Sequence, residues 1–164
     1  MEQEKKIQNY QKVIENLENF FEKYNQDDFG LDKMARYTIV SAAINNEFKE
    51  FNFVGFYTVE KKDKGEILEI GPYQSDILAT AHIQFGKGVC GTCWEKKETI
   101  IINDVNECNN YIACDGVTKA EICVPIFKSD GEMIALLDID SLVQDFFTKT
   151  DKDNLEKIVK FIVK

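Results

Sequence analysis

The chain has 164 residues, of which 44% are hydrophobic and 12% aromatic, and this is enough for one domain with a substantial core. Its 29 acidic and 20 basic residues give a formal net charge of −9, so its overall field repels phosphate backbones and anionic lipid. We therefore expect neither nucleic acid nor a membrane as a partner. No apolar run approaches the roughly 20 residues that span a bilayer, and the charged N-terminus is unlike a secretory signal. We expect a cytoplasmic protein.

Two amphipathic helices are predicted within residues 1–47. The first runs from Gln3 to Tyr24, because apolar side chains recur at spacings of three and four residues: Ile7, Tyr10, Ile14, Leu17, Phe21 and Tyr24. Its aromatic stripe is a candidate interface in a homodimer. The second helix is expected to begin after Asp27 or Asp28, either of which can serve as its N-cap, and to end near Asn45 and Asn46. Its apolar face is expected to contain Leu31, Met34, Ala35, Ile39 and Ala42.

A change to β-branched and aromatic residues marks the first strands. Segments 53–59 and 67–70 are separated by a polar stretch with a glycine, and this pattern predicts a hairpin. Further strands are expected over 79–85 and 99–102, with a short helix over 89–97 between them.

The strongest hairpin signal lies near the C-terminal end. Segments 121–127 and 133–140 flank Ser129-Asp130-Gly131, whose Asp-Gly step suits the positive φ angles of a tight turn. Pro125 has no amide hydrogen, so we expect its strand to lie at a sheet edge or to be locally irregular there.

A last helix is predicted to begin near Thr150 and Asp151 and to bury four apolar residues, Leu155, Ile158, Val159 and Ile162. Hairpins imply antiparallel pairing, and helices gathered at both ends of the chain can cover one face of the sheet. The sequence therefore predicts an α+β fold, with residues 1–164 forming a single domain.

Five cysteines in a chain without an export signal are typical of a reducing compartment, where thiols are often catalytic, redox-active or metal-binding. Cys90 and Cys93 form a C-x-x-C pair, and Cys90 lies in the glycine-rich segment Gly86-Lys87-Gly88-Val89-Cys90-Gly91. The antiparallel context does not suit a thioredoxin or dinucleotide-binding motif. We expect Cys90 to be the reactive thiol, with a pKa lowered by the turn, and Cys93 to face inward beside Trp94.

Zinc is the main alternative for the cysteines. Cys90, Cys93, Cys108 and Cys114 could form a four-ligand site with His82 in reserve, although the second pair has a wider spacing than usual. His82 alternates with apolar neighbours and is expected to be structural.

The most informative residue is Cys114, which lies in the loop segment 111–116, where reactive groups are often displayed. Glu121 follows, and then Asp138 and Asp140, which share one side of a strand because they are two residues apart. These carboxylates could line a pocket that binds a cation and supplies protons to a reaction at Cys114. Alternatively, the two aspartates end their strand in solvent.

Across residues 52–156 the sequence resembles the free methionine-R-sulfoxide reductases, which are stand-alone GAF-domain enzymes. The resemblance rests on these motifs: Asn52-Phe53-Val54-Gly55-Phe56-Tyr57, Gly71-Pro72-Tyr73-Gln74, Phe85-Gly86-Lys87-Gly88-Val89-Cys90-Gly91-Thr92, Asp104-Val105, Tyr111-Ile112-Ala113-Cys114-Asp115, Glu121-Ile122-Cys123-Val124-Pro125-Ile126-Phe127 and Leu137-Asp138-Ile139-Asp140-Ser141. It implies a GAF-like central antiparallel sheet with the N- and C-terminal helices packed on one face, and a catalytic core over 52–156.

The resemblance also implies roles for individual residues. Cys114 matches the catalytic cysteine and Cys90 the cysteine that resolves it. The carboxylates Glu121, Asp138 and Asp140 match those of the substrate pocket, with Glu121 and Asp140 also assigned to catalysis, and Tyr57 and Phe53 match its aromatic residues. Phe53 replaces the usual tryptophan. Thr80 replaces a third family cysteine, so the redox cycle must use Cys90 alone or recruit another thiol.

The implied reaction needs no metal or cofactor. A thiolate attacks the sulfoxide sulfur, methionine leaves, and the resulting sulfenic acid condenses with a second thiol to a disulfide. An external dithiol such as thioredoxin then reduces the disulfide. Two further functions remain open at this point: a GAF module that binds a small ligand without catalysis, and a zinc-stabilised domain.

Overall fold

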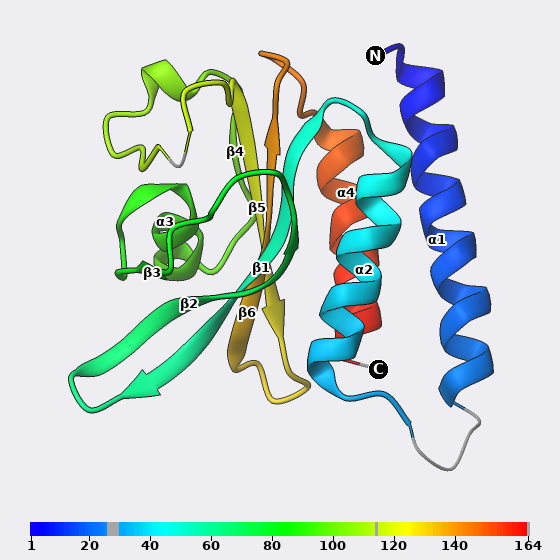
Figure 1. Ribbon diagram of the computed structural model, residues 1–164, viewed down its shortest axis with the longest axis horizontal. Coiled ribbons are helices and arrows are strands. Elements are labelled where there is room, and N and C mark those ends of the chain that lie inside the picture. The colour runs from blue at the N-terminus through cyan, green and yellow to red at the C-terminus, as the bar shows by residue number, and fades with distance from the viewer. Residues whose placement is uncertain (26–29, 114, 164) are drawn as a thin grey trace.

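The computed structural model describes residues 1–25, 30–113 and 115–163. Its centre is a six-stranded antiparallel sheet in the order β3-β2-β1-β6-β5-β4 (Figure 1). The strands are β1 Phe51–Lys62, β2 Gly65–Gln74, β3 His82–Ile83, β4 Ile100–Ile102, β5 Ala120–Phe127 and β6 Met133–Ser141. The predicted α+β class is confirmed.

The helices lie on both sides of this sheet (Figure 1). Helices α1 (Gln3–Asn25), α2 (Lys33–Glu47) and α4 (Lys149–Ile158) cover one face, and α3 (Gly88–Lys96) lies on the other. Two short 3-10 segments, η1 (Val105–Glu107) and η2 (Val159–Ile162), complete the elements. The expectation that the N- and C-terminal helices share one face is confirmed. Within the described residues, no helix combines the length and the apolar character needed to cross a membrane.

Both predicted hairpins form. β1 and β2 pair up to Lys62 opposite Gly65, and β5 and β6 are joined by a turn in which Gly131 has a φ of 85°. Asp130 has no positive φ, so only the glycine uses the left-handed region. β4 pairs with only Glu121–Cys123. Among the described residues, β5 therefore has no strand partner on that flank beside Pro125, and the expectation of an edge holds locally.

The strand predicted over 79–85 is too long. Only His82 and Ile83 pair with β2, because the chain turns at Gln84, whose carbonyl accepts the Lys87 amide at 3.0 Å. Before the strand, the carbonyl of Thr80 accepts a hydrogen bond from the Tyr57 hydroxyl.

The N-cap of α2 is Asp32, whose side chain accepts the Ala35 amide at 2.8 Å. Asp27 and Asp28, the predicted caps, lie outside the described residues. The predicted apolar face of α2 is only partly right: Leu31 and Ile39 are partly buried and pack against the core, but Met34 is 45% exposed. The buried apolar side chains of the helix are Tyr37, Val40 and Ile44. The helix carries apolar residues on two sides, and packing on the sheet buries the side that contains Tyr37, whose ring stacks on Phe56 of β1 at 4.6 Å.

The apolar stripe of α1 is largely buried within the chain. Tyr10, Leu17 and Phe21 belong to the core on the helical face of the sheet, together with Val13, which the stripe omitted. Ile7 is 39% exposed. The aromatic stripe proposed as a dimer interface is therefore occupied by the chain's own core.

The sheet separates two cores because side chains alternate between its faces. On β5 and β6, Ile122, Val124, Leu137 and Ile139 join the core beneath the helices. Their neighbours on the opposite face pack toward α3, where a second, smaller core includes Cys90, Cys93, Trp94 and Cys123. The candidate site lies on this second face.

Candidate active site

The register of the β5–β6 hairpin brings four functional side chains together. Glu121 lies opposite Asp140, and Cys123 lies opposite Asp138. Residues two apart on a strand share a face, so all four belong to the face toward α3. The prediction that Asp138 and Asp140 share one side is confirmed. They are 7% and 6% exposed, so the alternative in which they end the strand in solvent is wrong.

The glycine turn before α3 places Cys90 over this face. Gly86 and Gly88 have φ angles of 71° and 63°, which favour glycine. At Gly91 a Cβ would lie 2.5 Å from the carbonyl oxygen of Gln84, so the helix can approach the turn only with glycine there. Cys90 is buried in the first turn of α3.

Cys93 lies one turn later on the same helix. It is fully buried and joins Trp94 in the core on the site face, as the sequence predicts.

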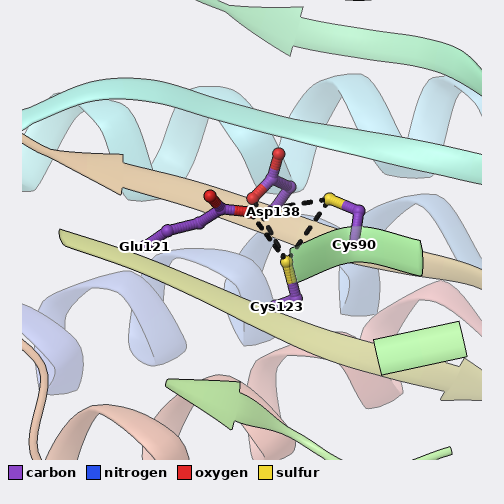
Figure 2. Close-up of side chains that lie close together, drawn as sticks. All are labelled: Cys90, Glu121, Cys123 and Asp138. Carbon is purple, nitrogen blue, oxygen red and sulfur yellow. Dashed lines mark hydrogen bonds between the residues drawn. The ribbon is translucent and has the colours of Figure 1, made fainter. Parts of the chain in front are cut away.

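Two thiols and two carboxylates meet between α3 and the sheet (Figure 2). We call Cys90, Glu121, Cys123 and Asp138 the thiol–carboxylate cluster. The Sγ atoms of Cys90 and Cys123 are 3.3 Å apart. The Cys123 thiol is within donating distance of Oε1 of Glu121 (3.3 Å) and Oδ1 of Asp138 (3.4 Å), and the Cys90 thiol is 3.8 Å from Oε1 of Glu121.

Burial controls the acid–base properties of the thiols. It raises the pKa values of Cys90 and Cys123 well above their usual range, and the negative charges of Asp138 and Glu121 add to the rise. The expectation that the turn lowers the pKa of Cys90 is therefore wrong. The reason is that removing a thiolate from water costs more free energy than the N-terminus of a short helix contributes to its stabilisation.

The carboxylates respond in the same direction. Burial raises the pKa of Glu121 and of Asp140 well above their usual values, and neighbouring carboxylates reinforce both shifts. Burial raises the pKa of Asp138 to about 6, and hydrogen bonds from Cys90, Cys123 and Glu121 limit the rise. The bond between the two carboxyls raises the pKa of Glu121 and lowers that of Asp138.

A small cavity of about 20 Å³ lies beside the cluster, which is space for about one water molecule. It is lined by Tyr57, Ile83, Gly88, Val89, Cys90, Tyr111, Ile112, Glu121, Asp138 and Asp140. None of these described lining residues is basic. Oδ1 of Asp140 is buried and has no hydrogen-bond partner among the described residues. The cavity therefore combines three acidic side chains with an unused acceptor.

Cys114, the predicted catalytic cysteine, lies outside the described residues. Its neighbour Asp115 accepts the amides of Val117 and Thr118 at 2.8 Å and is held by the Asn52 side chain, also at 2.8 Å. Burial alone would raise the pKa of Asp115, but these hydrogen bonds outweigh it and lower the pKa. Asp115 is thus a fixed carboxylate that ties the loop to the start of β1.

The two predicted pocket aromatics differ in position. Tyr57 lines the cavity and donates its hydroxyl hydrogen to the carbonyl of Thr80 at 2.9 Å. Phe53 is buried beside it in the same core and stacks on Tyr73 at 5.3 Å. It does not line the cavity and therefore serves as support.

Among the described members of the predicted zinc set, Cys93, Cys108 and His82 do not form a metal-binding group with Cys90. In the described part of the chain, the group with metal-ligand spacing is the thiol–carboxylate cluster, whose ligand atoms lie within 4.8 Å of one another. Cys93 and Cys108 do not belong to it, and His82 is an exposed residue 3.8 Å from Glu69. Two thiols and two carboxylates are donors that a zinc-like cation accepts.

Sequence reasoning left Cys123 without a role. Its position could have been found, because it lies two residues after Glu121 in the same strand and the predicted turn sets it opposite Asp138. The cavity lining from Ile83 and Ile112 carried no such local signal.

Comparison with known proteins first defines the class. A family model described as GAF domain matches residues 35–162. The Free methionine-R-sulfoxide reductase of Saccharomyces cerevisiae is 45% identical over 115 residues, which cover 70% of this chain and 63% of the yeast protein. The chain thus spans less than two thirds of that relative.

Solved structures agree with this result. The reduced form of fRMsr of Staphylococcus aureus has a TM-score of 0.81 at 37% identity and covers 93% of this chain and 92% of its own. Free methionine-R-sulfoxide reductase from Neisseria meningitidis in complex with its substrate has a TM-score of 0.80 at 33% identity, covering 93% and 85%. The chain belongs to the free methionine-R-sulfoxide reductase family of GAF domains.

Proposed function

We propose that this protein reduces free methionine-R-sulfoxide to methionine with its own thiols. The observation that carries the proposal is the small cavity lined by the Cys90 thiol and three carboxylates, of which Asp140 has a buried oxygen without a hydrogen-bond partner among the described residues. Such a site suits a small zwitterion whose ammonium group satisfies a buried carboxylate. The names of its relatives point to the same substrate.

In the proposed binding mode, Asp140 receives the substrate ammonium through Oδ1. The first amides of α3, which have no acceptor within the helix, hold the substrate carboxylate at Gly88 and Val89, two residues that line the cavity. A methionine sulfoxide within a polypeptide lacks the free ammonium group and is therefore excluded.

In the proposed reaction, Cys114 attacks the sulfoxide sulfur and Glu121 protonates the departing oxygen. Glu121 suits this task because burial and the neighbouring aspartates raise the pKa of its carboxyl well above the usual value. The raised pKa favours the protonated form, which can donate the proton. Oxygen then passes to Cys114 as a sulfenic acid while methionine leaves. Cys90 condenses with this sulfenic acid to a disulfide and water.

The oxidised protein is returned to its dithiol form by an external dithiol of the thioredoxin type, and the reaction uses neither a metal nor an organic cofactor. Tyr111 and Ile112, which line the cavity, lie shortly before Cys114 in the sequence. This proximity supports the assignment of Cys114 as the attacking residue.

The test is a single-turnover assay with reduced protein, excess free methionine-R-sulfoxide and no reductant. We expect at least one methionine per chain with loss of thiols, none from Cys114→Ser, and none when N-acetylmethionine-R-sulfoxide replaces the free amino acid. Release of no methionine without thiol loss would contradict the proposal and leave a ligand-binding GAF module. Near-stoichiometric zinc in untagged protein would instead indicate a structural metal on the thiol–carboxylate cluster.

A further inference from the structure

We propose that Cys123 is a further redox-active thiol, which takes the disulfide from Cys90 and returns Cys114 to its reduced form. The inference rests on the proposed function and adds a second resolving step to it. The observation behind it is the contact between the Sγ atoms of Cys90 and Cys123, which are 3.3 Å apart although the residues belong to α3 and β5.

The contact is close enough for a disulfide to form by small side-chain movements, because the S–S bond length is about 2.0 Å. Cys90 lines the cavity, whereas Cys123 is fully buried behind it and is not a lining residue. Cys123 therefore reaches the redox chemistry through Cys90. Disulfide exchange could therefore pass from Cys90 at the cavity to Cys123 on the sheet.

The surroundings of Cys123 differ from those of a cysteine that only fills space. A packing cysteine behaves as a small hydrophobe, but the Cys123 thiol lies 3.4 Å from Oδ1 of Asp138 and 3.3 Å from Oε1 of Glu121. A nearby carboxylate can accept the thiol proton at the moment of attack, which a buried thiol needs because its thiolate is otherwise disfavoured.

The exchange is balanced within the protein. The Cys123 thiol gives its proton to Asp138, and its sulfur attacks Sγ of Cys90. The bond between Cys90 and Cys123 forms while the bond between Cys90 and Cys114 breaks, and the electron pair leaves on the Cys114 sulfur, which takes up a proton. One disulfide replaces another, so no oxidant is consumed and Cys114 is ready to react again.

This relay predicts a stoichiometry in the single-turnover assay. Without reductant, the wild-type protein should release about two methionines per chain and lose three of its five thiols, because the second reaction leaves Cys114 as a sulfenic acid. Cys123→Ser and Cys123→Ala should release about one methionine and lose two thiols. Cys93→Ser, which removes another buried thiol of α3 outside the cluster, should behave as the wild type.

One methionine from the wild type and from both Cys123 variants would overturn the relay while leaving the proposed function in place. No methionine from any of these proteins would overturn both.

A second experiment requires no turnover. Cys114→Ser treated with diamide, a thiol oxidant, should yield a linked Cys90–Cys123 peptide after digestion with the free thiols blocked, and Cys114→Ser/Cys93→Ser should yield the same peptide. Absence of that linkage in both folded proteins would overturn the relay even if methionine is released.

Discussion

Asp140 shows how a single buried atom can indicate a ligand. Its Oδ1 has no hydrogen-bond partner among the described residues although the side chain is buried, and an unpaired buried acceptor costs free energy. A substrate ammonium would remove that cost. The same unpaired oxygen therefore destabilises the free protein and favours binding of the substrate.

Replacing this carboxylate should weaken binding. We expect Asp140→Asn to raise the KM for free methionine-R-sulfoxide by about 10- to 100-fold, since hydrogen bonds to charged groups contribute about 1.5–3 kcal/mol. The matched control is Asp153→Asn, which neutralises a partly exposed carboxylate on α4 and should leave KM unchanged. Steady-state kinetics on both variants checks this, and an unchanged KM for Asp140→Asn would remove Asp140 from the binding mode.

The carboxyl of Asp138 should make stability depend on pH. Its folded-state pKa is raised from 3.8 to about 6, so its favourable contribution is complete below about 3.8 and is lost as pH rises through about 6. The shift from 3.8 to about 6 corresponds to about 3 kcal/mol.

Asp138→Asn removes this titration. The difference in free energy of unfolding, variant minus wild type, should increase by up to about 3 kcal/mol between about pH 4 and pH 7. Urea denaturation at several pH values measures it. A difference that stays constant or decreases with pH would show that Asp138 is not raised in this way.

At the scale of elements, α1 and α4 are joined by a buried ion pair. Nζ of Lys6 lies 2.8 Å from Oδ2 of Asp151, and both side chains are almost fully buried. Asp151 also accepts the Tyr10 hydroxyl at 2.9 Å and the Thr148 amide at 2.7 Å, which completes the capping box of α4. The Thr148 hydroxyl donates to it as well, at 2.9 Å, so one carboxylate satisfies four donors, two from α1 and two from the N-cap of α4.

Asp151→Ala should destabilise the protein by about 3–5 kcal/mol, because it leaves the Lys6 ammonium buried and unpaired. Asp153→Ala removes only an exposed i,i+4 pair with Lys149 and should cost about 0.5 kcal/mol or less. Thermal and chemical denaturation of the two variants gives the comparison. Equal effects would show that the buried pair does not anchor α1.

At the scale of the whole molecule, the sheet separates the larger hydrophobic core on one face from the candidate active site on the other. The larger core joins α1, α2 and α4 to one face, and the cluster and cavity occupy the other. The cavity of about 20 Å³ is far smaller than an amino acid, so substrate entry requires movement on the α3 face. Gly88 and Ile112 face each other across this cavity so closely that a Cβ on Gly88 would lie 3.0 Å from the Ile112 side chain.

Hydrogen exchange should report this opening. We expect amides of residues 109–112 to exchange faster than those of β1 and β6, and excess methionine to slow the former with little effect on α1 or α2. Mass spectrometry with and without methionine measures the exchange of these amides on both faces of the sheet. If methionine slowed exchange in α1 and α2 as much as in residues 109–112, the opening would not be confined to the α3 face.

Much of the fold and part of the candidate site can be predicted from short stretches of the sequence. Alternating residues in segments 121–127 and 133–140, with a glycine turn between them, determine which side chains of β5 and β6 share a face and which lie opposite one another. The common side of Asp138 and Asp140 was predicted for this reason, whereas the pocket role of Glu121 was implied by the family resemblance. The position of Cys123 opposite Asp138 follows from the same strand pattern.

Other features depend on tertiary structure. The sequence by itself determined the two hairpins, the α+β class and the common face of the carboxylates, because each depends on neighbouring residues in the chain. Only tertiary packing decided which face of α2 is buried, and only packing placed Cys90 against Cys123, 33 positions away. It also reversed the expected pKa shift of Cys90, because exclusion of water depends on every layer that covers a residue rather than on its local sequence.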